Sequence, residues 1–293
     1  MPLSQVSYAS LKQLQDNASG TQSTTAADTV RLTQFGIRAS KIIDQITGVV
    51  FAPVIATRYI RASDDAVSGF KITLPEPMLE LTTVTLADSG STVLTAGTDI
   101  RGYPRNNDPI FYLQALADST YLNSASNSLD DDITILGVWG WHSDYSNAWV
   151  TSGDAVKTSA LLTTGTTVLV DDADGVSGDG YLPRFSPGNL IKVDSEYMAI
   201  TGVDTSTDTL TVVRGQNGST AAAHEIAAAI SVWAPEPDIV RACMLIGTFG
   251  YDRKGQSSRV SWESVRAGSN RYDIPSEALE ILREYDIIKT GVV

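Results

Sequence analysis

The sequence is poor in cysteine, histidine and charge for a chain of 293 residues. Its one cysteine, Cys243, excludes an intramolecular disulfide, a four-cysteine zinc site and a CxxC redox motif. Two histidines, His142 and His224, leave little for a histidine-rich metal site or a proton relay. The longest stretches without a charge, 45–57 and 158–170, have 13 residues each, whereas a membrane-spanning helix needs about 20. We therefore expect a soluble protein, made in a cytoplasm and used there or in an assembly built there.

Motifs for common cofactors and catalytic mechanisms are also missing. There is no Walker loop, no GxGxxG, no HExxH and no GxSxG nucleophile elbow. The acidic run at 171–174 lacks the spacing and the final glutamate of an EF-hand loop, because Val176 stands where the third ligand belongs. We interpret this run, and the aspartates at 130–132, as solvated turns, and Cys243 as a core residue. The sequence therefore predicts no catalytic residue, no metal site and no cofactor.

Acidic side chains outnumber basic ones by 34 to 21, which gives a net charge of −13. Proteins that wrap duplex DNA rely on clustered Lys and Arg, so this balance argues against that role. The one basic stretch is 253–271, which is open to three interpretations: a contact with DNA phosphates, a contact with an acidic protein surface, or a solvated loop. Its candidate contact residues are Arg253, Lys254, Arg259, Trp262, Arg266 and Arg271.

A dense aromatic group is formed by Trp139, Trp141, Tyr145 and Trp149. Aromatic faces stack on sugars and on bases, so a binding platform is one interpretation. Packing in a core or at a subunit interface is the other, because Trp and Tyr are enriched in both places. No basic residues accompany the group, and we therefore favour packing.

Apolar residues at helical spacing predict two helices near the start of the sequence. A short helix is expected at 7–15 with Ser7 as its cap. A long helix is expected from a cap at Asp28 to Thr47, and Gly48 follows where a helix commonly ends. One buried stripe is expected on the long helix, made of Leu32, Phe35, Ala39, Ile42 and Ile46.

Two β-rich sections follow, since β-branched and aromatic residues dominate the middle of the chain. In the first section, 49–150, strands are expected at 70–74 and 79–86, separated by the prolines at 75–77. In the second section, 151–235, short strands at close spacing predict a small barrel or sandwich.

Helices return after the prolines at 235 and 237. We expect one at 239–251 and a last one from Pro275 to about Lys289. The predicted fold is α+β: a small helical bundle domain, formed by 1–48 and 236–293, is split by the inserted antiparallel β sections. Such an arrangement would bring the outer helices together and bury the stripe of the long helix.

Several short motifs stand in the helical segments. They are YASLK at 8–12, ASKIIDQITG at 39–48 with the FAP that follows it, YDRKG at 251–255 and PSEA at 275–278. With these motifs the helical segments resemble the head–tail connector (adaptor) proteins of long-tailed bacteriophages. Within the second β section, 191–198, 213–221 and His224 resemble a β module found in phage structural proteins. The resemblance covers roughly 90 residues of the helical segments and about 65 of the module.

The resemblance implies a structural protein of the virion neck rather than an enzyme. Adaptors of this family assemble as a ring, usually of twelve subunits, beneath the portal at the capsid vertex. They extend the DNA channel and present a surface to the stopper or tail. The net charge of −13 would suit a channel through which the genome passes without specific binding, which is a hypothesis from charge alone. The expected partners are the portal protein, stopper or tail-completion proteins and further copies of the chain. The basic stretch at 253–271 and the C-terminal segment are the expected portal contacts.

Two alternatives remain at this stage. The chain is open to interpretation as another phage structural part, such as a stopper, a tail-completion protein or a capsid-decorating protein. The aromatic group and the many acids also leave open a carbohydrate-binding module or a glycan-active enzyme.

Overall fold

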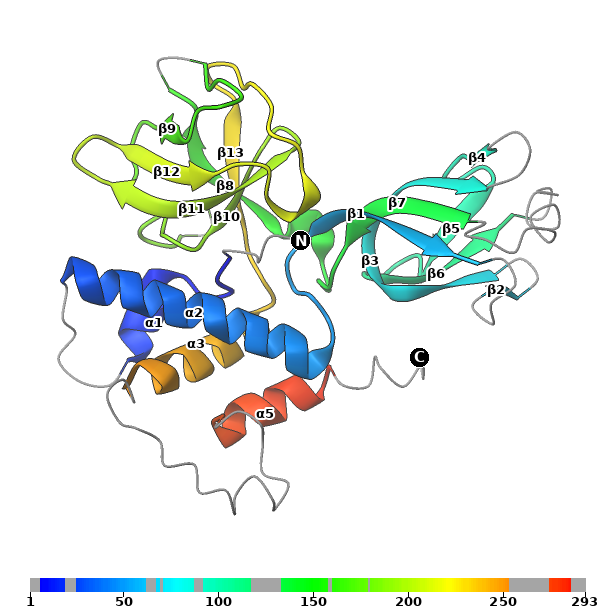
Figure 1. The fold of residues 1–293 in the computed structure, drawn as a ribbon, viewed down its shortest axis with the longest axis horizontal. Helices are drawn as coiled ribbons and strands as arrows, with labels where there is room; N and C mark the ends of the chain where they lie inside the picture. Colours follow the sequence, from blue (N-terminus) through cyan, green and yellow to red (C-terminus); the bar gives the residue numbers. More distant parts are fainter. Residues whose placement is uncertain are drawn as a thin grey trace. The chain divides into compact units, whose positions relative to one another are not determined.

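The computed structural model describes residues 6–18, 25–61, 67–68, 71–86, 92–116, 133–157, 160–178, 180–252 and 274–285. The fold is α+β, with helices and two antiparallel sheets, as predicted (Figure 1). The chain divides into two compact units. The helix–barrel unit comprises Met1–Gly48, Trp149–Gln216 and Thr220–Val293, and the sheet unit comprises Val49–Ala148 and Asn217–Ser219.

Among the described residues of the helix–barrel unit, four α-helices form a bundle: α1 (Leu11–Asn17), α2 (Ala26–Thr47), α3 (Pro237–Asp252) and α5 (Ser276–Arg283). The caps predicted for the first two helices are wrong by three residues. Ser10 caps α1, because its hydroxyl and the side chain of Gln13 form a capping box. Thr25 caps α2. Gly48 ends α2 in the left-handed conformation at φ 69°, as predicted.

The helices from the two ends of the chain pack against each other. Gly36 on α2 and Gly247 on α3 allow close approach, since a Cβ on Gly247 would stand 3.6 Å from the Gly36 Cα. Cys243 is fully buried there, and burial raises the pKa of its thiol, as expected of a core residue. Polar pairs join the same helices at the edges: the Tyr251 hydroxyl donates to Asp28 at 3.1 Å. The buried residues of α2 include Leu32, Ala39, Ile42 and Ile43, whereas Phe35 and Ile46 are partly exposed.

The sheet unit has a sheet in the order β1-β7-β3-β6-β5, in which β2 and β4 also pair with β3. The predicted break at Pro75–Pro77 is wrong, because β3 is one long strand through the prolines. A register shift between Thr73 and Met78 in the β3–β6 ladder leaves the prolines where no ladder donor is required. The strands are β1 (Val54–Ile60), β2 (Val67–Ser68), β3 (Lys71–Leu86), β4 (Val93–Leu94), β5 (Ile100–Tyr103), β6 (Ile110–Ala115) and β7 (Ile133–Trp139).

The second sheet belongs to the helix–barrel unit and has the order β8-β13-β10-β11-β12-β9. It curls into a barrel, because Lys157 N, just beyond β8, donates to Leu169 O on β9 at 2.8 Å. Its core contains Phe185, Met198 and Ile230. The bounds are β8 (Trp149–Ala155), β9 (Thr167–Leu169), β10 (Leu190–Val193), β11 (Glu196–Asp204), β12 (Thr209–Val213) and β13 (Ala229–Trp233).

Candidate functional site

A buried glutamate organises one end of the barrel. Glu196 opens β11 after a tight turn in which Asp194 has φ 51°. Its side chain has no exposed surface and accepts from Arg214 Nε and Nη2, both at 2.7 Å. Backbone N–H groups of Gly215 and Ala222 donate to the same carboxylate at 2.9 and 3.0 Å. Such a geometry satisfies a buried charge almost completely.

His224 completes this group, which we call the Glu196 network (Glu196, Arg214, His224 and Asp194). The His224 ring is 1% exposed, with Nε2 2.9 Å from Glu196 and Nδ1 2.7 Å from Asp194. Burial tends to raise the pKa of the Glu196 carboxyl. Hydrogen bonds from Arg214, Ala222, His224 and Gly215 outweigh it and lower that pKa to about 2. The carboxylate is therefore ionised across the physiological range.

The Glu196 network holds a neighbouring loop in place. Arg214 Nη1 donates to the carbonyls of Leu162 and Gly165 at 2.9 and 2.7 Å. The backbones of Leu161 and His224 exchange two hydrogen bonds of 2.9 Å as an isolated antiparallel bridge. The side chain of Leu162 is nevertheless 68% exposed. Buried charges, those of Glu196 and Arg214, thus fix the backbone of an apolar residue that faces solvent.

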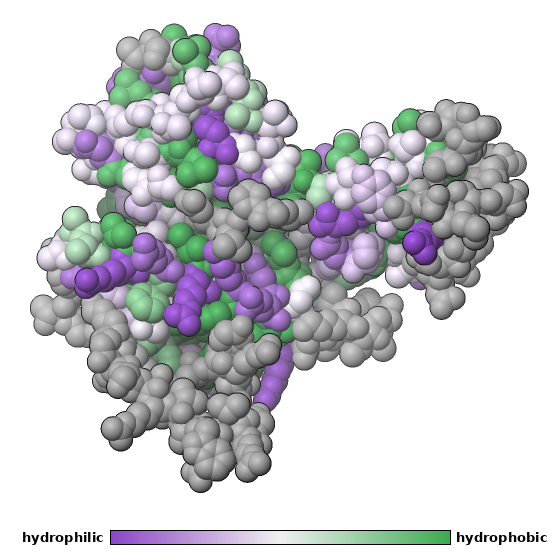
Figure 2. Space-filling view, in the orientation of Figure 1, coloured by the Kyte–Doolittle hydropathy of each residue, from purple (hydrophilic) through white to green (hydrophobic). Residues whose placement is uncertain are grey.

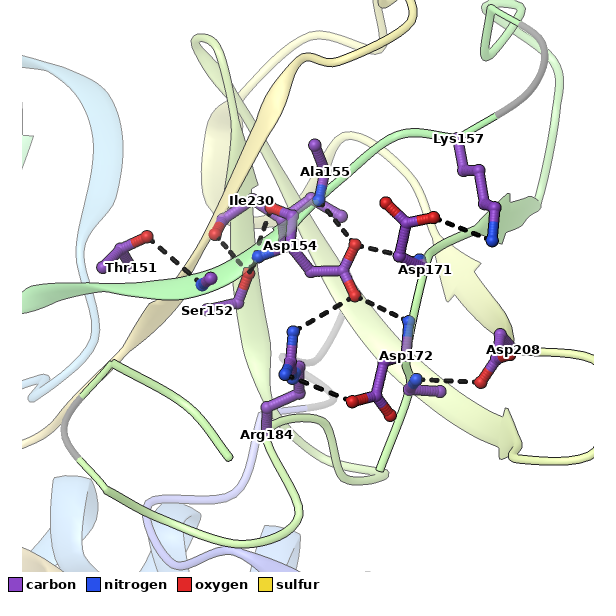
Figure 3. A network of polar contacts seen from close by, with 12 residues as sticks. Thr151, Ser152, Asp154, Ala155, Lys157, Asp171, Asp172, Arg184, Asp208 and Ile230 are labelled. Atoms are coloured by element: carbon purple, nitrogen blue, oxygen red, sulfur yellow. Dashed lines mark hydrogen bonds and ion pairs between the residues drawn. The ribbon is translucent and has the colours of Figure 1, made fainter. Parts of the chain in front are cut away.

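A second buried carboxylate, Asp154 on β8, closes the barrel (Figure 3). Its oxygens accept from the backbone N–H groups of Ala155, Asp171 and Asp172 at 2.7, 3.0 and 2.9 Å. The last two residues lie just beyond β9, after Val170, so the Asp154 side chain connects the strands at opposite ends of the sheet order. Arg184 Nη1 adds a longer contact of 3.3 Å to the same carboxylate.

Arg184 extends this second group, the Asp154 network (Asp154, Arg184 and Asp172), toward another loop. Its Nη2 lies 3.4 Å from Asp172, and its backbone N–H donates to Gly175 O at 2.8 Å. The solvated turn predicted at 171–174 is confirmed for its three aspartates, which are exposed, whereas Ala173 between them is fully buried and its N–H donates to Asp208. Among the described residues, no group of three or more His, Cys, Asp or Glu is arranged to hold a metal ion.

The aromatic residues singled out by the sequence fall into different surroundings. In the sheet unit, Trp139 is 1% exposed, donates from Nε1 to Ala56 O at 2.8 Å and is covered by the Arg58 guanidinium. Such burial leaves Trp139 no face for a sugar. In the same unit, the Trp141 ring lies 5.7 Å from the Phe111 ring, and Tyr145 belongs to a short 3₁₀ helix.

Trp149 instead belongs to the helix–barrel unit, where its ring lies 5.1 Å from Tyr197 and 5.2 Å from Trp233.

The candidate contact residues at 253–271 all lie outside the described residues. Sequence reasoning included Glu196 and Arg214 only as parts of a resemblance, and it missed Asp154 and Arg184. The sequence carried one signal for Glu196: this glutamate stands directly before the apolar residues of strand β11.

Comparison with known proteins assigns no family to this chain. No protein-family model matches it, and neither a curated protein nor a solved structure does. Within the described residues, no helix is long and apolar enough to span a membrane. Functional conclusions therefore rest on the residues and contacts of the chain itself.

Proposed function

We propose that the chain is a structural adaptor of a phage virion neck, which assembles as a ring beneath the portal and joins head to tail. The observation that supports this proposal most strongly is the helical bundle built from both ends of the described chain. Asn17 on α1 bonds with Thr248 on α3 at 2.9 Å, and Arg241 on α3 reaches Asn17 and Glu277 on α5. Because helices from both ends of the described chain contact each other directly, the bundle keeps its own core although the β sections are inserted between them.

Attachment of the barrel to the bundle supports a role in assembly. Ser7 N donates to Gly188 O at 2.9 Å, and Gln13 on α1 donates to the Tyr181 hydroxyl at 2.9 Å. These bonds fasten the inserted barrel to the helical frame within one compact unit. A subunit that carries load between a capsid and a tail benefits from such internal rigidity.

Charge is also consistent with a channel protein. The net charge of −13 gives a subunit that DNA phosphates repel on average. A closed ring of such subunits would let the genome pass without holding it. We propose twelve copies per ring, from the family resemblance, with portal and stopper or tail-completion proteins as partners.

Mass photometry tests the proposal. The protein is measured alone and after mixing with purified portal rings of long-tailed phages, at matched subunit concentrations. We expect the portal peak to gain mass in one step equal to a closed ring of 31.3-kDa chains. A portal peak that stays unchanged with every portal tested, together with a free chain that never associates, would contradict the adaptor function.

A further inference from the structure

The outer side of α2 carries positive charge and apolar surface next to each other. Arg31, Arg38 and Lys41 are spaced by seven and three residues, so one side of the helix presents all three. Val30 and Ile37 lie on the same side, and Val30 is 56% exposed. In Figure 2, hydrophilic residues follow the line that α2 takes in Figure 1. We call this surface the α2 face; its residues are Val30, Arg31, Gln34, Ile37, Arg38 and Lys41.

The buried side of α2 points the opposite way. Leu32, Ala39 and Ile43 are at most 4% exposed and belong to the core of the bundle. Successive residues of a helix are turned by about 100°, which places these three about half a turn away from the middle of the α2 face. Packing within the unit therefore uses one side of α2 and leaves every residue of the α2 face exposed or half-exposed.

The cations of the α2 face are not neutralised by the described part of the chain. Neither Arg38 nor Lys41 forms an ion pair with a described residue. Arg31 Nη1 lies 3.9 Å from Asp28 Oδ1, which is a long contact. The two acids of α2, Asp28 and Asp44, each accept a hydrogen bond from a tyrosine hydroxyl of the same unit, at 3.1 and 2.7 Å. A positive surface thus remains on a chain whose net charge is −13.

An acidic, amphipathic helix has the chemistry that complements the α2 face. Its carboxylates would meet the three cations, and its apolar side chains would cover Val30 and Ile37. The cations span about 15 Å along the axis from Arg31 to Lys41, close to three helical turns. Duplex DNA complements this surface less well, because phosphates leave the apolar pair uncovered. A duplex also carries one charge per about 1.7 Å, which a chain of net charge −13 repels.

We propose that the α2 face docks an acidic, amphipathic helix of another protein. Exposed ion pairs alone add little affinity, so the cations steer and orient the partner while burial of Val30 and Ile37 holds it. The spacing of these two residues, seven apart, is one that helical partners use for their anchors. The inference goes beyond the proposed function and does not depend on the ring, because the α2 face belongs to a single copy of the chain.

Fluorescence anisotropy with helical peptides tests the chemistry of the partner. The probe is a labelled peptide of about 20 residues, with leucine at every seventh position and glutamates on both sides of each leucine. A second peptide has glutamine in place of each glutamate. We expect the acidic peptide to bind the full chain at least about ten-fold more tightly than the neutral one at low salt, and to weaken at physiological salt. Equal affinity for the two peptides, or binding of neither, would overturn the inference.

Removal of the three cations locates the binding surface. Arg31→Gln, Arg38→Gln and Lys41→Gln together should weaken binding of the acidic peptide at least about ten-fold. A matched control removes the same charge from exposed cations elsewhere in the unit, by Lys12→Gln, Lys157→Gln and Arg283→Gln together. We expect the control to weaken binding less than about three-fold, because it alters only the net charge. Circular dichroism melting checks that both variants fold. Equal losses in the two variants would refute the assignment to α2.

Val30 distinguishes a protein partner from nucleic acid. Val30→Gln should weaken binding of the acidic peptide about three- to ten-fold, because an apolar contact is lost. Leu162→Gln, at a barrel leucine that is 68% exposed, is the matched control and should leave binding unchanged. A labelled DNA duplex is titrated in parallel. Duplex binding that is tighter than peptide binding, and that depends on the three cations but not on Val30, would replace the helix by phosphates as the partner and contradict the inference.

Discussion

The Glu196 network and the Asp154 network both fasten loops to the barrel through a buried carboxylate, but their ion pairs differ in length. Glu196 receives Arg214 in a bidentate pair at 2.7 Å and has a lowered carboxyl pKa. Asp154 receives three backbone donors, but Arg184 approaches it at 3.3 Å, and the Arg184 Nε is buried without a hydrogen-bond partner. Charge-assisted bonds at short distance are the strong ones. The comparison teaches that the first network depends on its ion pair, whereas the second depends on backbone donors.

The largest expected effect comes from removing the centre of the tighter network. Glu196→Ala leaves the Arg214 guanidinium buried without its carboxylate and frees the N–H groups of Gly215 and Ala222. We expect a loss of about 3–5 kcal/mol in the free energy of unfolding, measured by urea denaturation. The exposed Glu225→Ala is the matched control and should change stability by less than about 0.5 kcal/mol. Equal effects of the two substitutions would refute the role given to Glu196.

Low pH should weaken the same network. The folded-state pKa of Glu196, about 2, lies below the ordinary value of 4.5, so its ionised form stabilises the fold. This contribution is complete above pH 4.5 and is lost as the pH falls toward 2. From the difference in pKa we expect it to reach about 3 kcal/mol. Urea titrations between pH 6 and pH 2 check this, with Glu196→Gln as the control that should show a flatter profile. An identical profile in that variant would assign the acid sensitivity to other groups.

Arg184 offers the direct contrast within the second network. Arg184→Met removes two long contacts, while Asp154 keeps its donors from Ala155, Asp171 and Asp172. We expect a loss of about 1–2 kcal/mol, smaller than for Glu196→Ala. The measurement is the same urea denaturation. A loss as large as that of Glu196→Ala would remove the distinction between the two networks.

The smallest effect is expected for an exposed ion pair beside the Asp154 network. Lys157 lies 2.7 Å from Asp171, and both side chains are largely exposed. Water screens such a pair, so Lys157→Ala should leave the unfolding midpoint unchanged within error. A clear shift of the midpoint would show that surface charges also support barrel closure.

Local signals in the sequence predicted the helices well and their first residues poorly. Gly48 ends α2 because only a residue at ease with positive φ fits there. The start of α1 was missed because Ser7 and Ser10 both suit a cap, and only Ser10 has Gln13 at the right distance for a capping box. Strand β3 was split in two because a register shift that accommodates prolines depends on neighbouring strands.

The candidate site was harder to predict than the fold, because its bonds join residues far apart in sequence. The side-chain partners of His224 are Glu196 and Asp194, 28 and 30 residues away in the sequence. The donors to Asp154 include backbone N–H groups, which carry no signature in the amino-acid sequence. Exposure of Leu162 and Leu182 likewise depends on how the barrel loops fold.

Electron microscopy of the chain bound to portal rings tests the adaptor function most directly. Side views should show added density coaxial with the portal and confined to its outer end, and end views should show a closed ring with an open centre. Density scattered over the portal surface, or no added density at saturating protein, would contradict the adaptor.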